Sequence, residues 1–375
     1  MDVRREYNYD LLRIISTIAV IGIHVTSTWV GAMTNENYFG ELYQEGILVT
    51  CIYDVLTRFA VPCFIMLSGA FILADDRNRN FNFFYQKTFI KIGIPTMIFS
   101  LGYMLFYVIL VVITTDRGTV FDRIVASSIQ AIQSLLHGVP YYHMWYLYMM
   151  IGVYLFAPVL LLLKEQIGEK LFGRVSWIFL ACASLGYLTS TSGLYWDVGF
   201  SFRYVSYFMV GYELRKIGNK KKNNLKGIMC IAASIVIGII VIMMRYNQAL
   251  QGVTDEELKY QLILPLCPWI VAFSVCLFAG FSHLEIKKNV SRLSSLTFFI
   301  YLFHAGVWDI MSRIVRKKGS GYDNQIMIPI CIITVFLFSL LLAVIYETMQ
   351  KRIGQRVQSR KVRKKLYKEM QSNQL

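Results

Sequence analysis

One apolar stretch near the N-terminus, YDLLRIISTIAVIGIHVTSTW, contains an arginine and a histidine at a spacing that could do chemistry. Arg13 and His24 are 11 residues apart, so in a helix they lie on one face, about 20° apart around the axis and about 16 Å apart along it. A guanidinium binds anions, and a neutral imidazole accepts a proton near neutral pH. The pattern predicts that Arg13 meets an anionic reactant and His24 acts as a base. The alternative is a structural His24 and an Arg13 that extends to the membrane interface.

Two further apolar runs contain pairs of polar residues that are candidate site residues, His304 for catalysis and Asp54, Arg58 and Tyr301 for substrate binding. Asp54 and Arg58 are four residues apart and can pair on one face of a helix. Pro62 predicts a kink just after them, because proline removes a helical hydrogen bond. Tyr301 and His304 are three residues apart on one face. By its expected depth, Asp54 is the carboxylate best placed to orient either His24 or His304.

The remaining candidates lie at the ends of apolar runs. Substrate binding is the functional interpretation, while topology signals and an aromatic belt at the membrane interface are the alternatives. These residues are Asp10, Arg77, Lys87 and Lys91 at ends expected to face the cytoplasm, and His143 and Trp145 at an outer end. The seven cysteines are scattered singly through apolar stretches, which is typical of buried hydrophobic residues. The sequence therefore indicates no metal site and no bound cofactor.

The elements that must position these residues are membrane helices. Hydrophobic residues make up 56% of the 375 residues and charged residues only 16%, whereas a soluble domain contains about a quarter charged residues. The net charge of +15 could fit a nucleic-acid partner, but no soluble domain is visible to present a basic patch, so no nucleic-acid partner is expected. We expect an all-α, polytopic membrane helix bundle of about ten transmembrane helices. The ten runs are 10–31, 47–74, 91–114, 142–163, 174–190, 201–217, 226–244, 261–281, 295–312 and 326–346.

Orientation and domain organisation follow from the basic residues. If the N-terminus is cytoplasmic, the six predicted cytoplasmic segments hold 27 of the 38 lysines and arginines, which favours N-in and C-in. We expect one integral-membrane domain over residues 1–350 and a basic cytoplasmic tail over residues 351–375. A basic tail of this kind is attracted to anionic membrane lipids, although it could also serve only as a stop-transfer signal.

Several motifs occur in an order that points to a known family. They are Arg13 and His24 with Asp10 before them, VPCFIMLSGAFIL, Lys87 and Lys91 before IGIPTMIF, HMWYLYMMIGVYLFAPVL, and IYLFH ending at His304. In this order the chain resembles the integral-membrane acyltransferase-3 family, and more narrowly its compact surface-polysaccharide O-acetyltransferases. One departure is Met150, which stands where many members have a glutamate, so a role for that glutamate cannot be carried over.

The resemblance implies an O-acyltransferase of the cell membrane, with His24 as the base and Arg13 near the donor. It implies transfer of an acyl group, usually acetyl, from cytoplasmic acyl-CoA to a hydroxyl of a cell-envelope polysaccharide or its lipid-linked precursor. A transporter or flippase of a glycan-export system is the alternative. Transporters often contain paired repeats with broken helices at matching positions, and no internal repeat is found in the sequence.

Overall fold

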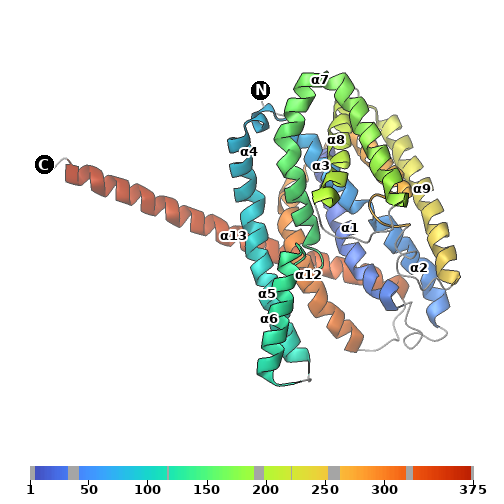
Figure 1. The fold of residues 1–375 in the computed structure, drawn as a ribbon, viewed down its shortest axis with the longest axis horizontal. Helices are drawn as coiled ribbons and strands as arrows, with labels where there is room; N and C mark the ends of the chain where they lie inside the picture. The colour runs from blue at the N-terminus through green and yellow to red at the C-terminus, as the bar shows by residue number, and fades with distance from the viewer. Residues whose placement is uncertain are drawn as a thin grey trace.

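The computed structural model describes residues 5–32, 42–115, 118–189, 198–220, 222–251, 262–317 and 324–372 (Figure 1). These residues form helices joined by short connections, and the described part contains no β-strand, so the all-α prediction is confirmed. The helices are α1 (Tyr7–Ala32), α2 (Leu42–Thr57), α3 (Ala60–Ile72), α4 (Phe81–Thr88), α5 (Ile94–Thr114), α6 (Val120–Leu136), α7 (Trp145–Thr189), α8 (Val198–Lys220), α9 (Asn224–Leu250), α11 (Pro268–His283), α12 (Ser291–Lys317) and α13 (Asn324–Ser372).

Seven helical segments of the described chain are long and apolar enough to cross a membrane, and α11 is a shorter apolar helix. Each of the ten predicted runs lies mainly on a helix. The runs 142–163 and 174–190 lie on the two limbs of α7, which turns at Gly168, where φ is 76°. This backbone conformation is one that glycine adopts without a steric penalty. The count of ten crossings and the cytoplasmic location of both termini stay predictions.

Helix α1 lies at the centre of the bundle and packs against α2, α3, α11, α12 and α13 (Figure 1). Its central position keeps the ionisable residues of α1 away from lipid, where they would be costly. The helices α5 and α9 lie nearer the edge of the bundle, and both expose apolar side chains such as Leu101, Leu105, Ile235 and Ile239. Exposed apolar faces at the edge are expected of helices that contact lipid.

The boundary between α2 and α3 is set by Pro62. A proline has no N–H to donate to the carbonyl four residues earlier, which here belongs to Arg58. Helix α2 ends at Thr57 and α3 begins at Ala60, so the interruption falls at Arg58 and Phe59. The helix is therefore interrupted just before Pro62, and Arg58 lies at this interruption.

Helix α3 packs unusually closely against α8 through glycine. A Cβ atom added to Gly69 would lie 1.7 Å from the carbonyl oxygen of Phe208, and one added to Gly211 would lie 2.1 Å from that of Met66. Small residues allow helix backbones to approach in this way in membrane proteins. The reciprocal contact fixes α3, and with it the side chains that α3 contributes to the interior.

Candidate active site

A cavity of about 330 Å³ lies inside the bundle, among α1, α3, α7, α12 and the segment before α11. Its polar and aromatic lining comprises His24, Arg58, His143, Trp145, Tyr146 and Tyr301, and its apolar lining comprises Val20, Ile23, Val61, Phe64, Ile263, Leu264 and Pro265. Five of the residues predicted from the sequence therefore meet in one space. A mostly apolar pocket with a few convergent polar groups is the usual form of a small-molecule site.

Three histidines lie together at this cavity. The ring centroids of His24 and His304 are 5.2 Å apart, as are those of His143 and His304. His304 is fully buried, and its Nδ1 lies 2.5 Å from the carbonyl oxygen of Tyr301. A carbonyl oxygen can only accept, so Nδ1 carries the proton and Nε2 carries a lone pair.

Three ring nitrogens of this histidine cluster are available to bind a ligand or to transfer a proton. Nε2 of His304 and both ring nitrogens of His143 are buried without a hydrogen-bond partner in the described part of the chain. Buried polar atoms usually have partners, so exceptions call for an explanation such as a catalytic role or a bound molecule. His24 is half-buried and is the member that lines the cavity with His143. The geometry makes His24 the candidate base and His304 its neighbour.

Asp54 does not orient a histidine, and that part of the sequence prediction is wrong. Its Oδ1 accepts hydrogen bonds from Nε of Arg58, at 3.0 Å, and from Nη2 of the same residue. Its Oδ2 lies 3.7 Å from Nε of Arg245 on α9. The predicted pairing of Asp54 with Arg58 is confirmed. The physical reason for the difference is that the guanidinium groups of Arg58 and Arg245 lie in apolar surroundings and need a negative partner, so both approach this carboxylate.

Arg13 lies at the other end of the same face of α1. Its Nη1 donates to Oγ of Ser294, at 3.2 Å, and to Oδ1 of Asp10, at 3.4 Å. Ser294 and His304 both belong to α12, so Arg13 and His24 face the same neighbouring helix. The prediction that they share one inward face is confirmed.

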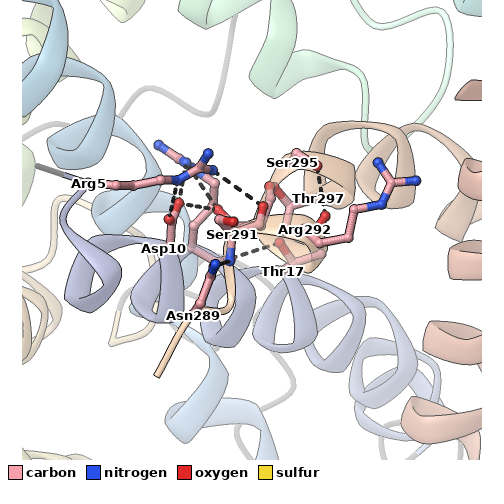
Figure 2. Close-up of polar contacts among 10 residues, drawn as sticks. Arg5, Asp10, Thr17, Asn289, Ser291, Arg292, Ser295 and Thr297 are labelled. Carbon is pink, nitrogen blue, oxygen red and sulfur yellow. Dashed lines mark hydrogen bonds and ion pairs between the residues drawn. The ribbon is translucent and has the colours of Figure 1, made fainter. Parts of the chain in front are cut away.

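Asp10 holds this end of α1 against α12. Its Oδ1 accepts a hydrogen bond of 2.6 Å from Ser294, and its Oδ2 accepts one of 2.9 Å from Nε of Arg5. Figure 2 shows Arg5 beside Asp10, with Ser291 at the start of α12, whose carbonyl oxygen accepts a second bond from Arg5 at 3.3 Å. Both oxygens of Asp10 thus accept hydrogen bonds from protein groups, and one of these groups is Arg13. Asp10 therefore helps to position Arg13, while its predicted role in substrate binding stays a prediction.

The basic residues near α4 lie outside the cavity. Arg77 is exposed and forms an ion pair of 2.9 Å with Asp75, and its hydrogen bonds hold the pKa of the Asp75 carboxyl below the usual value. Lys87 donates to Asn78 at 3.3 Å, and Lys91 is exposed. The structure does not bring these three predicted site residues to His24, so a role in donor binding stays a prediction.

Aromatic residues around the cavity were undervalued by the sequence interpretation. The ring of Tyr142 lies 5.0 Å from that of His24 and is 39% exposed, and its hydroxyl donates to the carbonyl oxygen of Ala305 at 3.3 Å. Tyr146 lines the cavity beside Trp145. The run YYHMWY was the available signal, but an aromatic belt accounts for the same composition, so the sequence did not separate the two explanations.

A comparison with protein-family models identifies the chain. The model described as an acyltransferase domain, that of the acyltransferase-3 family, matches residues 6–345, which include Arg13, the cavity and all three clustered histidines. The chain belongs to the acyltransferase-3 family. It is a multi-pass membrane acyltransferase, as the motifs indicated. Neither the curated proteins nor the solved structures contain a match to this acyltransferase.

Proposed function

We propose that this acyltransferase moves an acyl group, in the simplest case acetyl, from cytoplasmic acyl-CoA to a hydroxyl of a cell-envelope polysaccharide or its lipid-linked precursor. The protein would act in the cell membrane. The observation that carries the proposal is the arrangement of α1, which has Arg13 at one end of its inward face and His24 at the cavity. An anion-binding group and a base are thus joined by one rigid helix.

Arg13 suits the anionic part of a CoA thioester. Its Nη1 is used by Asp10 and Ser294, while its Nε and Nη2 make no hydrogen bond in the described part of the chain. Its side chain is 32% exposed, and both of these nitrogens have some accessible surface. Two guanidinium nitrogens can hold a phosphate through paired charge-assisted hydrogen bonds. With the phosphates held there, the pantetheine arm extends along α1 and delivers the thioester to the cavity.

His24 suits the proton transfer that acyl transfer requires. Its imidazole removes the proton of the acceptor hydroxyl as that oxygen forms a bond to the thioester carbonyl carbon. The tetrahedral intermediate then collapses, the carbon–sulfur bond breaks, and the CoA sulfur takes the proton from the His24 imidazolium. The products are the O-acyl sugar and free CoA, and His24 returns to its neutral form.

The cavity suits a small acceptor group. Its volume of about 330 Å³ is at the lower end of the range of about 300–1,000 Å³ for small-molecule sites, so the thioester end of the donor and a single sugar unit would fill it. Trp145 and Tyr146 line it, and Tyr142 stands beside His24. Such side chains combine a flat apolar face with a polar group, which suits a sugar ring.

Donor binding tests the assignment of Arg13 directly. The affinity of the purified acyltransferase for acetyl-CoA is measured in nanodiscs, for the parent and for Arg13→Ala. A hydrogen bond to a charged group contributes about 1.5–3 kcal/mol, so the variant should bind about 10- to 100-fold more weakly. Arg292→Ala is the matched control, because Arg292 lies on α12 but is 61% exposed and pairs with Glu347. Unchanged affinity in folded Arg13→Ala would place the donor elsewhere.

The cellular counterpart tests the acceptor class. Cells with and without the gene are compared for O-acetyl groups on the envelope glycans and for the amount of exported glycan. Loss of acetyl groups with normal export supports the proposal. Loss of export with normal acetylation of the remaining glycan would favour the transporter alternative.

A further inference from the structure

We propose that Arg58 is a further catalytic residue of this enzyme, whose guanidinium stabilises the negative charge that develops on the thioester carbonyl oxygen during transfer. The inference rests on the proposed acyl transfer and assigns an electrostatic role to a residue that the base and the donor-binding arginine leave unused. It follows from the position of Arg58 in the cavity, its hydrogen bonds and the local balance of charge.

The reaction requires such a group. When the acceptor oxygen bonds to the carbonyl carbon, the carbonyl π electrons move onto oxygen and give a tetrahedral oxyanion. That charge disappears again when the carbon–sulfur bond breaks. Preorganised donors aimed at an oxyanion are often the largest single contribution to catalysis of acyl transfer, because they act in a water-poor site and need no reorganisation.

Arg58 is the group in the cavity that matches this need. It lines the same cavity as His24. Of the described residues that line the cavity, it is the only arginine or lysine. Its side chain is only 13% exposed, so little solvent screens its charge.

The hydrogen bonds of Arg58 leave one nitrogen for a ligand. Its Nε and Nη2 both donate to Oδ1 of Asp54, whereas its Nη1 has no partner in the described part of the chain. Nη1 is not fully buried and has accessible surface. Asp54 therefore fixes the plane of the guanidinium while Nη1 stays free to donate. Arg58 lies at the interruption between α2 and α3 that precedes Pro62.

The charge balance of the cluster supports the same role. Asp54 and Arg245 are 1% and 6% exposed, so all three charged groups are withdrawn from water. One carboxylate shared by two guanidinium groups leaves one positive charge uncompensated within the described residues. An uncompensated buried charge is costly in a membrane protein, and ionisable residues retained there are usually functional. A negative charge that appears transiently in the adjoining cavity gives this cation its use.

Two other roles for Arg58 make different predictions. A purely structural Arg58 would hold the side chain of Asp54, which in turn contacts Arg245 on α9. Its removal would then lower the yield of folded protein. An Arg58 that binds an anionic acceptor would contribute equally to the bound substrate and the transition state. Its removal would then raise the KM for the acceptor without lowering kcat.

The test measures kcat and both KM values for Arg58→Gln and Arg58→Lys in purified enzyme with acetyl-CoA and an acceptor that the parent acetylates. Arg245 remains beside Asp54 in both variants, so each should fold. We expect kcat of Arg58→Gln to fall about 100- to 1,000-fold, as on removal of an oxyanion donor, with both KM values within about threefold. The kcat of Arg58→Lys should fall less, because lysine keeps the positive charge but lacks the planar guanidinium. Added methylguanidinium should restore activity to Arg58→Gly.

The outcomes separate the two proposals. If the parent transfers acetyl and Arg58→Gln keeps kcat within about threefold, the role of Arg58 is refuted while the proposed function stands. A raised acceptor KM with unchanged kcat, or a loss of activity that only follows the amount of folded protein, also refutes it. If the parent transfers acetyl to no hydroxyl acceptor, the proposed function fails and this inference fails with it.

Discussion

The close contact between α3 and α8 predicts that Gly69→Ala destabilises the enzyme. A Cβ atom at Gly69 would lie 1.7 Å from the carbonyl oxygen of Phe208, whereas real Cβ atoms essentially never approach an atom closer than 3.0 Å, so the helices must separate by about 1.3 Å. The obstacle is backbone, so no flexible side chain can move aside. Overpacking of a well-packed interior costs about 1–3 kcal/mol, and we expect the upper part of this range here.

The same displacement should reach the active site. Helix α3 contributes Val61 and Phe64 to the cavity and follows directly after Arg58. Misplacement of reacting groups by about 1 Å can cost about 100-fold in rate, so the folded fraction of Gly69→Ala should also transfer acetyl more slowly.

The assay for this prediction is thermal unfolding in detergent together with acetyl transfer per folded molecule. Gly102→Ala is the matched control, because a Cβ atom at Gly102 of α5 meets nothing within 4 Å. This control should be neutral, or slightly stabilised because alanine favours a helix over glycine. If Gly69→Ala melts and transfers like Gly102→Ala, the close packing of α3 on α8 is refuted.

Three further predictions concern the site and the topology. His304→Ala should lower kcat by about tenfold or more at unchanged donor affinity, because the ring of His304 lies 5.2 Å from that of His24 and its buried Nε2 has no hydrogen-bond partner in the described part of the chain; a rate within about threefold would contradict this. Tyr142→Ala should raise the acceptor KM severalfold through loss of an aromatic face, Tyr142→Phe should not, and equal KM values in the two variants would exclude a stacking role. Reporters fused at Asp255 and Lys364 should lie outside and inside the cell respectively, and an external Lys364 would overturn the orientation.

Much of the site could be predicted from the sequence because the membrane penalises polar groups. An ionisable residue in an apolar helix must face the protein interior, so His24, Arg58 and His304 could be assigned to a common interior without a structure. Helical periodicity then placed Arg13 and His24 on one face. The all-α class follows from the same property of the membrane, because a long apolar run in lipid can form all its backbone hydrogen bonds internally only as a helix.

The partners of these residues could not be predicted, because they come from helices distant in the sequence. The expected depth of Asp54 in the membrane was compatible with a contact to a histidine. In the structure Arg245 approaches Asp54 from α9, and no local sequence pattern predicts that contact. The orienting acceptor of His304 is the backbone carbonyl of Tyr301, which every residue carries and no motif marks. Tyr142 escaped notice for a related reason, since interfacial aromatic residues and ligand-binding aromatic residues have the same composition.

The most direct test of the account is acetyl transfer by His24→Ala. The variant is purified with monodispersity and acetyl-CoA affinity matched to the parent, and transfer of labelled acetyl to the acceptor is followed at saturating substrates. His137→Ala, at an exposed histidine that ends α6, is the control. The account predicts that His24→Ala loses about 100- to 10,000-fold in kcat with unchanged donor affinity, while His137→Ala keeps the parent rate. A kcat of His24→Ala within about threefold of the parent would contradict the central claim that His24 is the base.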